Sequence, residues 1–352
     1  MQVTLVGLGN IGSFAAGLVA RLPEVRRLTV IDRDRFQPDN SPSQLAERGD
    51  SKKAKAHVLA ARLRRSRPDL AVDGVFAAVE DLPTGRLSCN VLLAAVDTLA
   101  TRQYLNEVSW LLGIPWIDGG VQADGGLVRI SVYQPSPDAP CLECSWDQRH
   151  YDALEAEYAC GGQEAPRTNA PACLGAVAAG LLAIECRKFL TDGREQAAIG
   201  KQIVLDTAWH KHYLVQLQRN PRCRFHHLLP AVERLNTAPQ QTTMNDLFSL
   251  AGSRDAVIRM PGRERFAKTT ACQACGRVDR SWRLIRETRP PGRMCRRCGG
   301  RSEVTGFDMT DQLCKAELPE TLLTRPLSRF GFTSGDILTV GERYIQLGGG
   351  DA

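Results

Sequence analysis

The sequence lacks a hydrophobic run long enough to cross a membrane. Its longest uncharged apolar stretch, residues 170–184, has 15 residues, whereas a membrane-spanning helix needs about 20. A charged-then-apolar leader is also missing, because a strand-like segment begins at residue 2 or 3. We therefore expect a cytoplasmic protein with no membrane partner. The chain has no internal repeat.

Strong net charge is also lacking. The formal charge is +6 over 352 residues, and 43% of the residues are apolar. This balance is typical of a globular chain of two or three domains and says little about partners until the charge is localised. The one local excess is a group of nine arginines between Arg277 and Arg301.

Cysteine, in contrast, is plentiful, with twelve residues. In the compartment expected here, cysteines are more often metal ligands, nucleophiles or small buried side chains than disulfide partners.

Strand-like and helix-like segments alternate through the first third of the chain. Strands are expected at 3–8, 28–32, 89–96 and 115–121, and helices at 11–21, 53–66 and 98–112. Such alternation predicts a parallel sheet with helices on both faces. The alternating apolar residues of "GGLVRISVYQ" then indicate an antiparallel extension. A polar stretch at about 147–170 and a small-residue helix at 171–190 follow.

The stretch "VTLVGLGNIGS" places Gly7, Gly9 and Gly12 between the first strand and the first helix. Glycines with this spacing give a tight turn and a close backbone approach to an anion at a helix N-terminus. Asp32 closes the next strand at the distance of a ribose-binding carboxylate. This pattern suits NAD, FAD and ATP equally.

Polar residues that follow the next strands help to distinguish among these three nucleotides. Asp34, Asn40 and Gln44 lie with Asp32 on one loop, and Lys55 opens the next helix, where it can reach a phosphate. Each is also compatible with an ordinary solvated loop or helix. Asp97 ends a buried apolar strand, where open α/β sheets bind ligands. A carboxylate there suits a magnesium ion that bridges phosphate oxygens.

In this order and spacing, the residues of positions 1 to about 230 resemble the adenylation domain of ubiquitin-activating-type enzymes, the ThiF/MoeB/HesA family. The resemblance rests on the glycine loop, Asp32-x-Asp34, Asn40, Gln44, Lys55-Ala56, Asp97-x-x-x-Thr101-Arg102-x-x-x-Asn106, "GIPWIDGGV" and "CLEC". It implies a Rossmann-like, mostly parallel α/β sheet with an antiparallel extension. It also implies a homodimer.

The resemblance further implies that the loop holds ATP and not a dinucleotide. Asp32 would bind the ribose hydroxyls and Asp97 a magnesium ion. Asn40 and Lys55 would bind the phosphates. The C-terminal glycine carboxylate of a ubiquitin-like protein would attack the α-phosphate, giving an acyl adenylate and pyrophosphate. Lys55 and the metal would stabilise the charge that develops there.

Two departures from the family pattern concern phosphate contacts. Ser43 stands before Gln44 where the family usually has arginine. Homodimeric members also supply an arginine from helices ahead of the first strand, and we expect no such helix here, because the first strand-like segment begins at residue 2 or 3. Either another arginine serves, or another protein supplies it, or adenylation is slow.

The first cysteine set is Cys141 and Cys144 of "CLEC". Family members complete a four-thiolate zinc site with a second CxxC near residue 220, where this chain has "RNPRCRFHH". Thiolate and imidazole are both tetrahedral zinc ligands. We therefore expect a structural zinc held by Cys141, Cys144, Cys223 and His226, with His227 as the competing ligand and an empty site as the alternative.

The second set points to a metal without any family argument. Cys272 and Cys275 form one CxxC pair and Cys295 and Cys298 another, each followed by glycine. This arrangement predicts a zinc ribbon that folds a module too small for a core of its own. Its arginines have no interleaved aromatic residue except Trp282, so a structural or protein-docking role is favoured over nucleic-acid binding.

Two further cysteines lie where the family's chain crosses the active site. Cys160 in "YACGGQ" is our candidate thioester nucleophile, because flanking glycines let its loop swing. Cys173 has the lower expected pKa in the first turn of a helix, but we expect it to pack against the core. The third alternative is that neither reacts.

The sequence therefore predicts an adenylation domain over 1–235, with a crossover loop at about 147–170, and a C-terminal module over 236–352 that contains a zinc ribbon at 272–298. The expected activity is adenylation of a ubiquitin-like modifier, thioester formation on an enzyme cysteine and transfer to a conjugating enzyme, in a bacterial conjugation system. The alternatives are a sulfur-carrier adenylyltransferase, an NAD-dependent oxidoreductase and an inactive zinc-ribbon adaptor.

Overall fold

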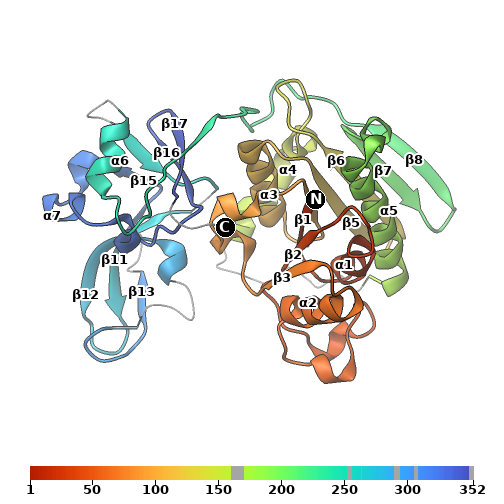
Figure 1. Ribbon diagram of the computed structural model, residues 1–352, viewed down its shortest axis with the longest axis horizontal. Helices are drawn as coiled ribbons and strands as arrows, with labels where there is room; N and C mark the ends of the chain where they lie inside the picture. The colour runs from red at the N-terminus through yellow and green to blue at the C-terminus, as the bar shows by residue number, and fades with distance from the viewer. Residues whose placement is uncertain (160–169, 252–255, 263, 289–293, 305–307, 349–352) are drawn as a thin grey trace. The chain divides into compact units, whose positions relative to one another are not determined.

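The computed structural model describes residues 1–159, 170–251, 256–262, 264–288, 294–304 and 308–348 (Figure 1). The chain divides into two compact units. Unit 1 comprises Met1–Leu82 and Leu87–Leu229, and unit 2 comprises Pro83–Arg86 and Pro230–Ala352. Unit 2 begins shortly before the predicted start at residue 236, because residues 232–234 already form one of its strands.

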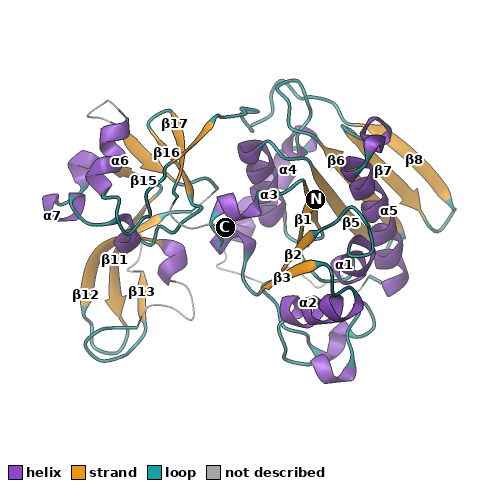
Figure 2. Ribbon diagram, in the orientation of Figure 1, coloured by secondary structure: helices purple, strands orange, loops and turns teal. Residues whose placement is uncertain are grey.

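Unit 1 is built on an eight-stranded sheet with the order β3-β2-β1-β4-β5-β6-β7-β8 (Figure 2). The first five strands in this order are parallel, and β5 to β8 are antiparallel neighbours. This arrangement confirms the expected parallel sheet with an antiparallel extension. The strands are β1 (Gln2–Val6), β2 (Arg27–Ile31), β3 (Ala71–Val75), β4 (Val91–Ala94), β5 (Trp116–Gln122), β6 (Leu127–Tyr133), β7 (Lys201–Asp206) and β8 (Lys211–Gln216).

Helices cover both faces of this sheet. Buried side chains of α1 (Gly12–Val19), α2 (Lys55–Ser66) and α5 (Ala172–Leu190) share one hydrophobic core with the sheet. Those of α3 (Leu99–Leu112) and α4 (Gln148–Ala159) share another. Alternate residues of one strand enter the two cores, as Leu5 and Val6 do, because successive side chains of a strand point to opposite faces.

Two elements of unit 1 differ from the sequence expectation. Strand β3 was not predicted, and of its five residues only Val72 is buried, so it carries little hydrophobic signal. Helix α4 occupies the first half of the expected polar crossover loop. Tyr151 and Leu154, one helical turn apart, are buried under it and anchor an otherwise polar helix.

Unit 2 contains two smaller sheets and its own hydrophobic core. The five-stranded sheet has the order β15-β10-β16-β17-β9, and β16 and β17 form an antiparallel pair near the C-terminus. The other sheet has the order β12-β11-β13, with β14 also paired to β11. The elements are β9 (Val232–Arg234), α6 (Met244–Leu250), β10 (Val257–Arg259), β11 (Phe266–Cys272), β12 (Val278–Leu284), β13 (Ser302–Val304), β14 (Met309–Thr310), β15 (Gln312–Cys314), α7 (Glu320–Leu323), β16 (Ile337–Val340) and β17 (Arg343–Gln346).

None of the helices in the described part of the chain combines the length and apolar character that a bilayer crossing requires.

Candidate active site and metal centres

The glycine loop joins β1 to α1 at the carboxyl edge of the unit 1 sheet. Gly7 has φ +85°, and a Cβ there would lie 2.4 Å from the Ala95 carbonyl oxygen. A Cβ on Gly12 would lie 1.8 Å from the Gly7 carbonyl oxygen. Only glycine therefore fits at these two positions.

The loop also leaves backbone donors available to an anion. Within the described residues, no hydrogen-bond acceptor faces the backbone N–H groups of Gly9, Asn10 or Ile11, which precede α1. Apart from its neighbours in the chain, no described residue has an atom closer than 4.0 Å to the Cβ position of Gly9. A close backbone approach with free N–H groups at a helix start fits a phosphate.

Asp32 is fixed against this loop from the end of β2. Its Oδ2 accepts a hydrogen bond from the backbone N–H of Leu8, and its Oδ1 accepts one from that of Asp34, both at 2.6 Å. Burial raises the pKa of the Asp32 carboxyl above its ordinary value, and the nearby Lys55 ammonium counteracts part of that rise. The arrangement holds a carboxylate at the predicted ribose position.

Lys55 is unusual among these site residues, because its charged side chain is only 6% exposed. It opens α2, and its Nζ lies 3.2 Å from Oδ2 of Asp34. Asp34 is itself 59% exposed, so the ammonium has one weakly held partner. A buried cation in this setting is well suited to an additional anion.

Asn40 and Gln44 follow on the loop after β2. The Asn40 Oδ1 accepts a hydrogen bond from the backbone N–H of Gln37 and closes a 3₁₀ turn, which leaves its Nδ2 as the group available to a ligand. The Gln44 amide lies over Gly9, with Nε2 at 4.0 Å from the Cβ position. Gln44 thus lies beside the glycine loop, and the phosphate-binding role of Asn40 stays a prediction.

Asn10 is a site residue that the sequence analysis did not identify. Its Nδ2 donates to the carbonyl oxygens of Ser43 and Ala170, both at 2.9 Å. One side chain thereby links the glycine loop to the loop after β2 and to the segment that leads into α5. Asn10 occupies a variable position of the glycine pattern, so the spacing gave no signal for it.

Asp97 follows β4, the neighbour of β1 on the other side, and is exposed. The sheet order therefore places it at the point where strand order reverses, between the ends of β1 and β4. One helical turn later, Arg102 forms an ion pair with Asp118 of β5, with Nε and Oδ1 3.0 Å apart. The sequence analysis named Arg102 in the family motif but gave it no role; the pair adds a shielded guanidinium close enough to Asp97 to interact with it electrostatically.

The structure describes only one of the two candidate nucleophiles. Cys160 lies outside the described residues. Cys173 is the second residue of α5 and is exposed, so the expectation that it packs against the core is wrong. The small residues of α5 that do pack lie on another side of the helix, including Gly175 and Ala178.

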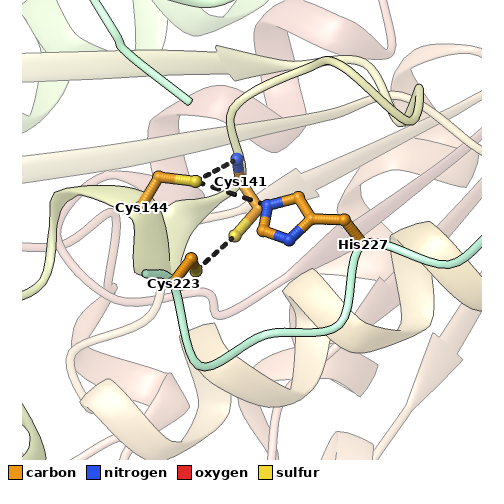
Figure 3. Close-up of side chains that lie close together, drawn as sticks. All are labelled: Cys141, Cys144, Cys223 and His227. Atoms are coloured by element: carbon orange, nitrogen blue, oxygen red, sulfur yellow. Dashed lines mark hydrogen bonds between the residues drawn. The ribbon is translucent and has the colours of Figure 1, made fainter. Parts of the chain in front are cut away.

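The first cysteine set assembles as a four-ligand cluster in which the side chains point toward one another (Figure 3). Its ligand atoms all lie within 4.8 Å of one another. The Sγ atoms of Cys141 and Cys223 are 3.7 Å apart, and the Sγ of Cys144 is 3.3 Å from Nε2 of His227. Three thiols and an imidazole at these separations are consistent with a zinc site.

The histidine of this cluster is His227 and not His226, which corrects the prediction. The Nδ1 of His227 lies 2.7 Å from the Phe225 carbonyl oxygen, a contact that leaves Nε2 free to face the thiols. His226 is exposed, and its Nδ1 accepts from the backbone N–H of Leu228. A left-handed turn at His227, with φ +54°, directs this side chain inward, and sequence spacing gives no signal for that turn.

The second set forms the other four-ligand cluster, in unit 2. Cys272 and Cys298 have Sγ atoms 3.5 Å apart, and those of Cys275 and Cys295 are 3.7 Å apart. The glycine after each CxxC pair has a positive φ, and its N–H donates to the carbonyl of the first cysteine of that pair. Two such tight turns carried by β11, β12 and β13 are consistent with a zinc module.

Comparisons with known proteins concern unit 1. The SAMP-activating enzyme E1 of Haloferax volcanii is 27% identical over 225 residues, covering 63% of this chain and 78% of that protein. The molybdopterin-synthase adenylyltransferase of Escherichia coli is 28% identical over 226 residues, covering 63% and 85%. The crystal structure of E. coli MccB with ATP has the same fold, with a TM-score of 0.52 at 20% identity; the match covers 63% of this chain and 65% of MccB.

The model of the ThiF family matches residues 1–225, which span the glycine loop, the polar residues around it and the first metal cluster as far as Cys223. Unit 2 lies almost entirely outside that match. The chain belongs to the ThiF family.

Proposed function

We propose that the protein adenylates the C-terminal glycine of a ubiquitin-like or sulfur-carrier protein. The chain is an adenylyltransferase of the ThiF family, and two of its relatives are named as an E1 and as an adenylyltransferase. In the reaction, a carboxylate oxygen of the substrate protein bonds to the α-phosphorus of ATP. The bond to the bridging oxygen breaks, and pyrophosphate leaves.

The observation that carries this proposal is the buried Lys55 ammonium beside the glycine loop. A positive charge held in a shielded position stabilises the negative charge that develops on the phosphate oxygens, and it needs no rearrangement during the reaction. The NAD-dependent oxidoreductase alternative is disfavoured, because residues 1–225 match the ThiF family.

The remaining residues take supporting roles. Asp32 would hold the ribose hydroxyls, while Asn40, Gln44 and the free N–H groups of the glycine loop would hold the phosphates. Asp97, at the end of β4, would bind Mg²⁺, which supplies charge neutralisation at the phosphates. The Arg102–Asp118 pair offers one guanidinium to a chain whose Ser43 replaces the family's usual arginine.

Transfer of the activated glycine to a thiol is the second part of the proposal. Cys160 is our candidate for the nucleophile, and a conjugating enzyme would then accept the modifier. Cys173 is the competitor, and its exposure at the start of α5 removes the argument against it. A sulfur-carrier adenylyltransferase would need neither cysteine. A homodimer is proposed on family resemblance.

The two four-ligand clusters are proposed as structural zinc sites. Zinc at a closed four-ligand site stabilises the fold and takes no part in the reaction. The first would fix the end of unit 1 against the segment that follows β6, and the second would hold the turns of unit 2 together.

Pyrophosphate exchange tests the adenylation. Purified protein should exchange labelled pyrophosphate into ATP only when a small protein ending in glycine is present. Asp97→Ala should lose the exchange. Tight NAD binding, with no exchange for any ubiquitin-like or sulfur-carrier protein, would overturn the proposal.

Non-reducing gels test the thioester separately. With ATP, Mg²⁺ and the modifier, Cys160→Ala should keep pyrophosphate exchange and lose a thiol-sensitive adduct. Loss of the adduct in Cys173→Ala alone would reverse the assignment. No adduct in the wild type would favour the sulfur-carrier alternative.

A further inference from the structure

Unit 2 concentrates positive charge that the proposed adenylation does not use. From the start of β11 to the end of β13, residues 266–304, the sequence has ten lysines and arginines and three acidic residues. These residues carry a formal charge of +7, compared with +6 for the whole chain. The rest of the protein is therefore nearly neutral, and the basic character belongs to this segment, the ribbon.

The cysteine cluster gathers part of this charge at one end of the ribbon. The contacts of Cys272 with Cys298 and of Cys275 with Cys295 hold the two CxxC turns side by side. Five residues next to or within these turns form what we call the ribbon tip: Arg277, Val278, Met294, Arg296 and Arg297.

All five residues of the ribbon tip are exposed. Val278 is 57% exposed and Met294 58%, so both apolar side chains are available to a partner. Within the described part of the chain, none of the three arginines of the tip forms an ion pair.

Other arginines of the ribbon behave differently. Arg286 is paired with the buried Asp336, and Arg301 with Glu303. The absence of partners is thus a property of the tip and not of the whole ribbon. The planar guanidinium of an arginine can donate two parallel hydrogen bonds to a carboxylate or phosphate, so less side-chain freedom is lost per hydrogen bond than with lysine.

The side chains of the ribbon favour a protein over a nucleic acid as the partner. Stacking of bases needs exposed aromatic rings, and the two aromatic residues of the ribbon, Phe266 and Trp282, are both buried. Lys268 lies over the Trp282 ring, with Nζ 5.0 Å from its centroid. Exposed methionine and arginine, in contrast, are enriched where proteins meet.

We propose that the ribbon tip binds a partner protein whose surface presents carboxylates around an apolar patch. The arginines pair with the carboxylates, and Val278 and Met294 pack against the apolar patch. Binding of this partner requires no step of adenylation. The proposal is therefore independent of the activity proposed for unit 1.

Fluorescence anisotropy of the full-length protein tests this surface. The probes are a labelled peptide of alternating glutamate and leucine, a glutamate-only peptide and a labelled 20-nucleotide single-stranded RNA, each at low and physiological ionic strength. We expect the glutamate–leucine peptide to bind best. Its affinity should fall with salt, because exposed ion pairs are screened.

Charge reversal at the tip gives the decisive comparison. Arg296→Glu with Arg297→Glu should weaken the glutamate–leucine peptide at least tenfold. The matched control, Arg26→Glu with Arg65→Glu on unit 1, changes the net charge equally and should leave binding unchanged. Both control arginines are exposed and form no ion pair with a described residue.

A separate variant tests the apolar contact that we propose for Val278 and Met294. Val278→Ser with Met294→Ser should weaken the glutamate–leucine peptide and leave the weaker glutamate-only peptide unaffected. An unchanged unfolding temperature would verify that each variant is folded. Equal loss in the tip and control variants, or no peptide binding by the wild type, would overturn the proposal. Tighter binding of RNA than of peptide, lost in the tip variant, would replace it with a nucleic-acid site.

Discussion

At the scale of single residues, burial decides which charges are available to a ligand. Lys55 and Asp32 are both buried at the carboxyl edge of the sheet, whereas Lys53, two positions before Lys55, is exposed. A buried charge acts on its neighbours through little screening water, so its influence on a phosphate is far greater than that of an exposed lysine.

Replacement of Lys55 by methionine therefore tests the proposed chemistry. Lys55→Met should reduce pyrophosphate exchange by roughly 100-fold or more, because a preorganised cation is lost from the site. Lys53→Met, which removes the same charge from an exposed position, should stay within about twofold of the wild type. Equal effects of the two substitutions would show that Lys55 contributes only to overall charge.

A second residue-scale prediction separates the adjacent histidines. His227→Ala should lower the zinc content from two ions per chain to one, because it removes a ligand atom that lies 3.3 Å from the Cys144 sulfur. His226→Ala should retain both ions, since His226 is exposed and bonded to the backbone. Elemental analysis of protein purified without chelator measures both. Loss of zinc in His226→Ala alone would restore the sequence-based assignment.

At the scale of elements, α5 illustrates how one helix carries glycines with opposite roles. A Cβ on Gly175 would lie 2.3 Å from Oδ1 of Asn10 and 2.5 Å from its carbonyl oxygen, which belongs to the glycine loop. A Cβ on Gly180 would meet nothing within 4 Å. The first glycine permits close packing of α5 on the active-site loop, and the second only weakens the helix.

Alanine at these two positions should consequently change stability in opposite directions. Gly180→Ala should stabilise the protein by about 0.5–1 kcal/mol and raise the unfolding temperature of unit 1 by roughly 1–4 °C. Gly175→Ala should lower that temperature and impair pyrophosphate exchange, because the clash involves backbone. Scanning calorimetry gives the sign. A stabilised Gly175→Ala variant would show that α5 packs less tightly than described.

The individual elements also differ in how well the sequence predicts them. The uninterrupted apolar run of β4 and the helical pattern of α3 carry a strong signal in the sequence, and the polar residues that follow β1, β2 and β4 locate the site. The segment of α4 is polar except where Tyr151 and Leu154 pack, so its pattern resembled a loop. His227 faces its cluster through a turn with positive φ, and Asn10 acts through tertiary contacts. Neither feature has a local signature.

At the scale of the whole molecule, each unit has a hydrophobic core and one four-ligand cluster. Domains with separate cores can unfold separately. We therefore expect two calorimetric transitions, each sensitive to its own metal. The known family accounts for residues 1–225, and the partner-binding surface proposed above lies in unit 2.

Serine substitution in each cluster tests this separation. Cys298→Ser should remove one zinc and lower the temperature of one transition by roughly 10 °C or more, because metal binding contributes directly to folding. Pyrophosphate exchange by this variant should stay within about twofold of the wild type. Cys144→Ser should remove the other zinc and lower the other transition, which reports unit 1. A single transition that moves equally in both variants would mean that the two units unfold as one. Loss of exchange in Cys298→Ser would mean that the ribbon also supports the adenylation site.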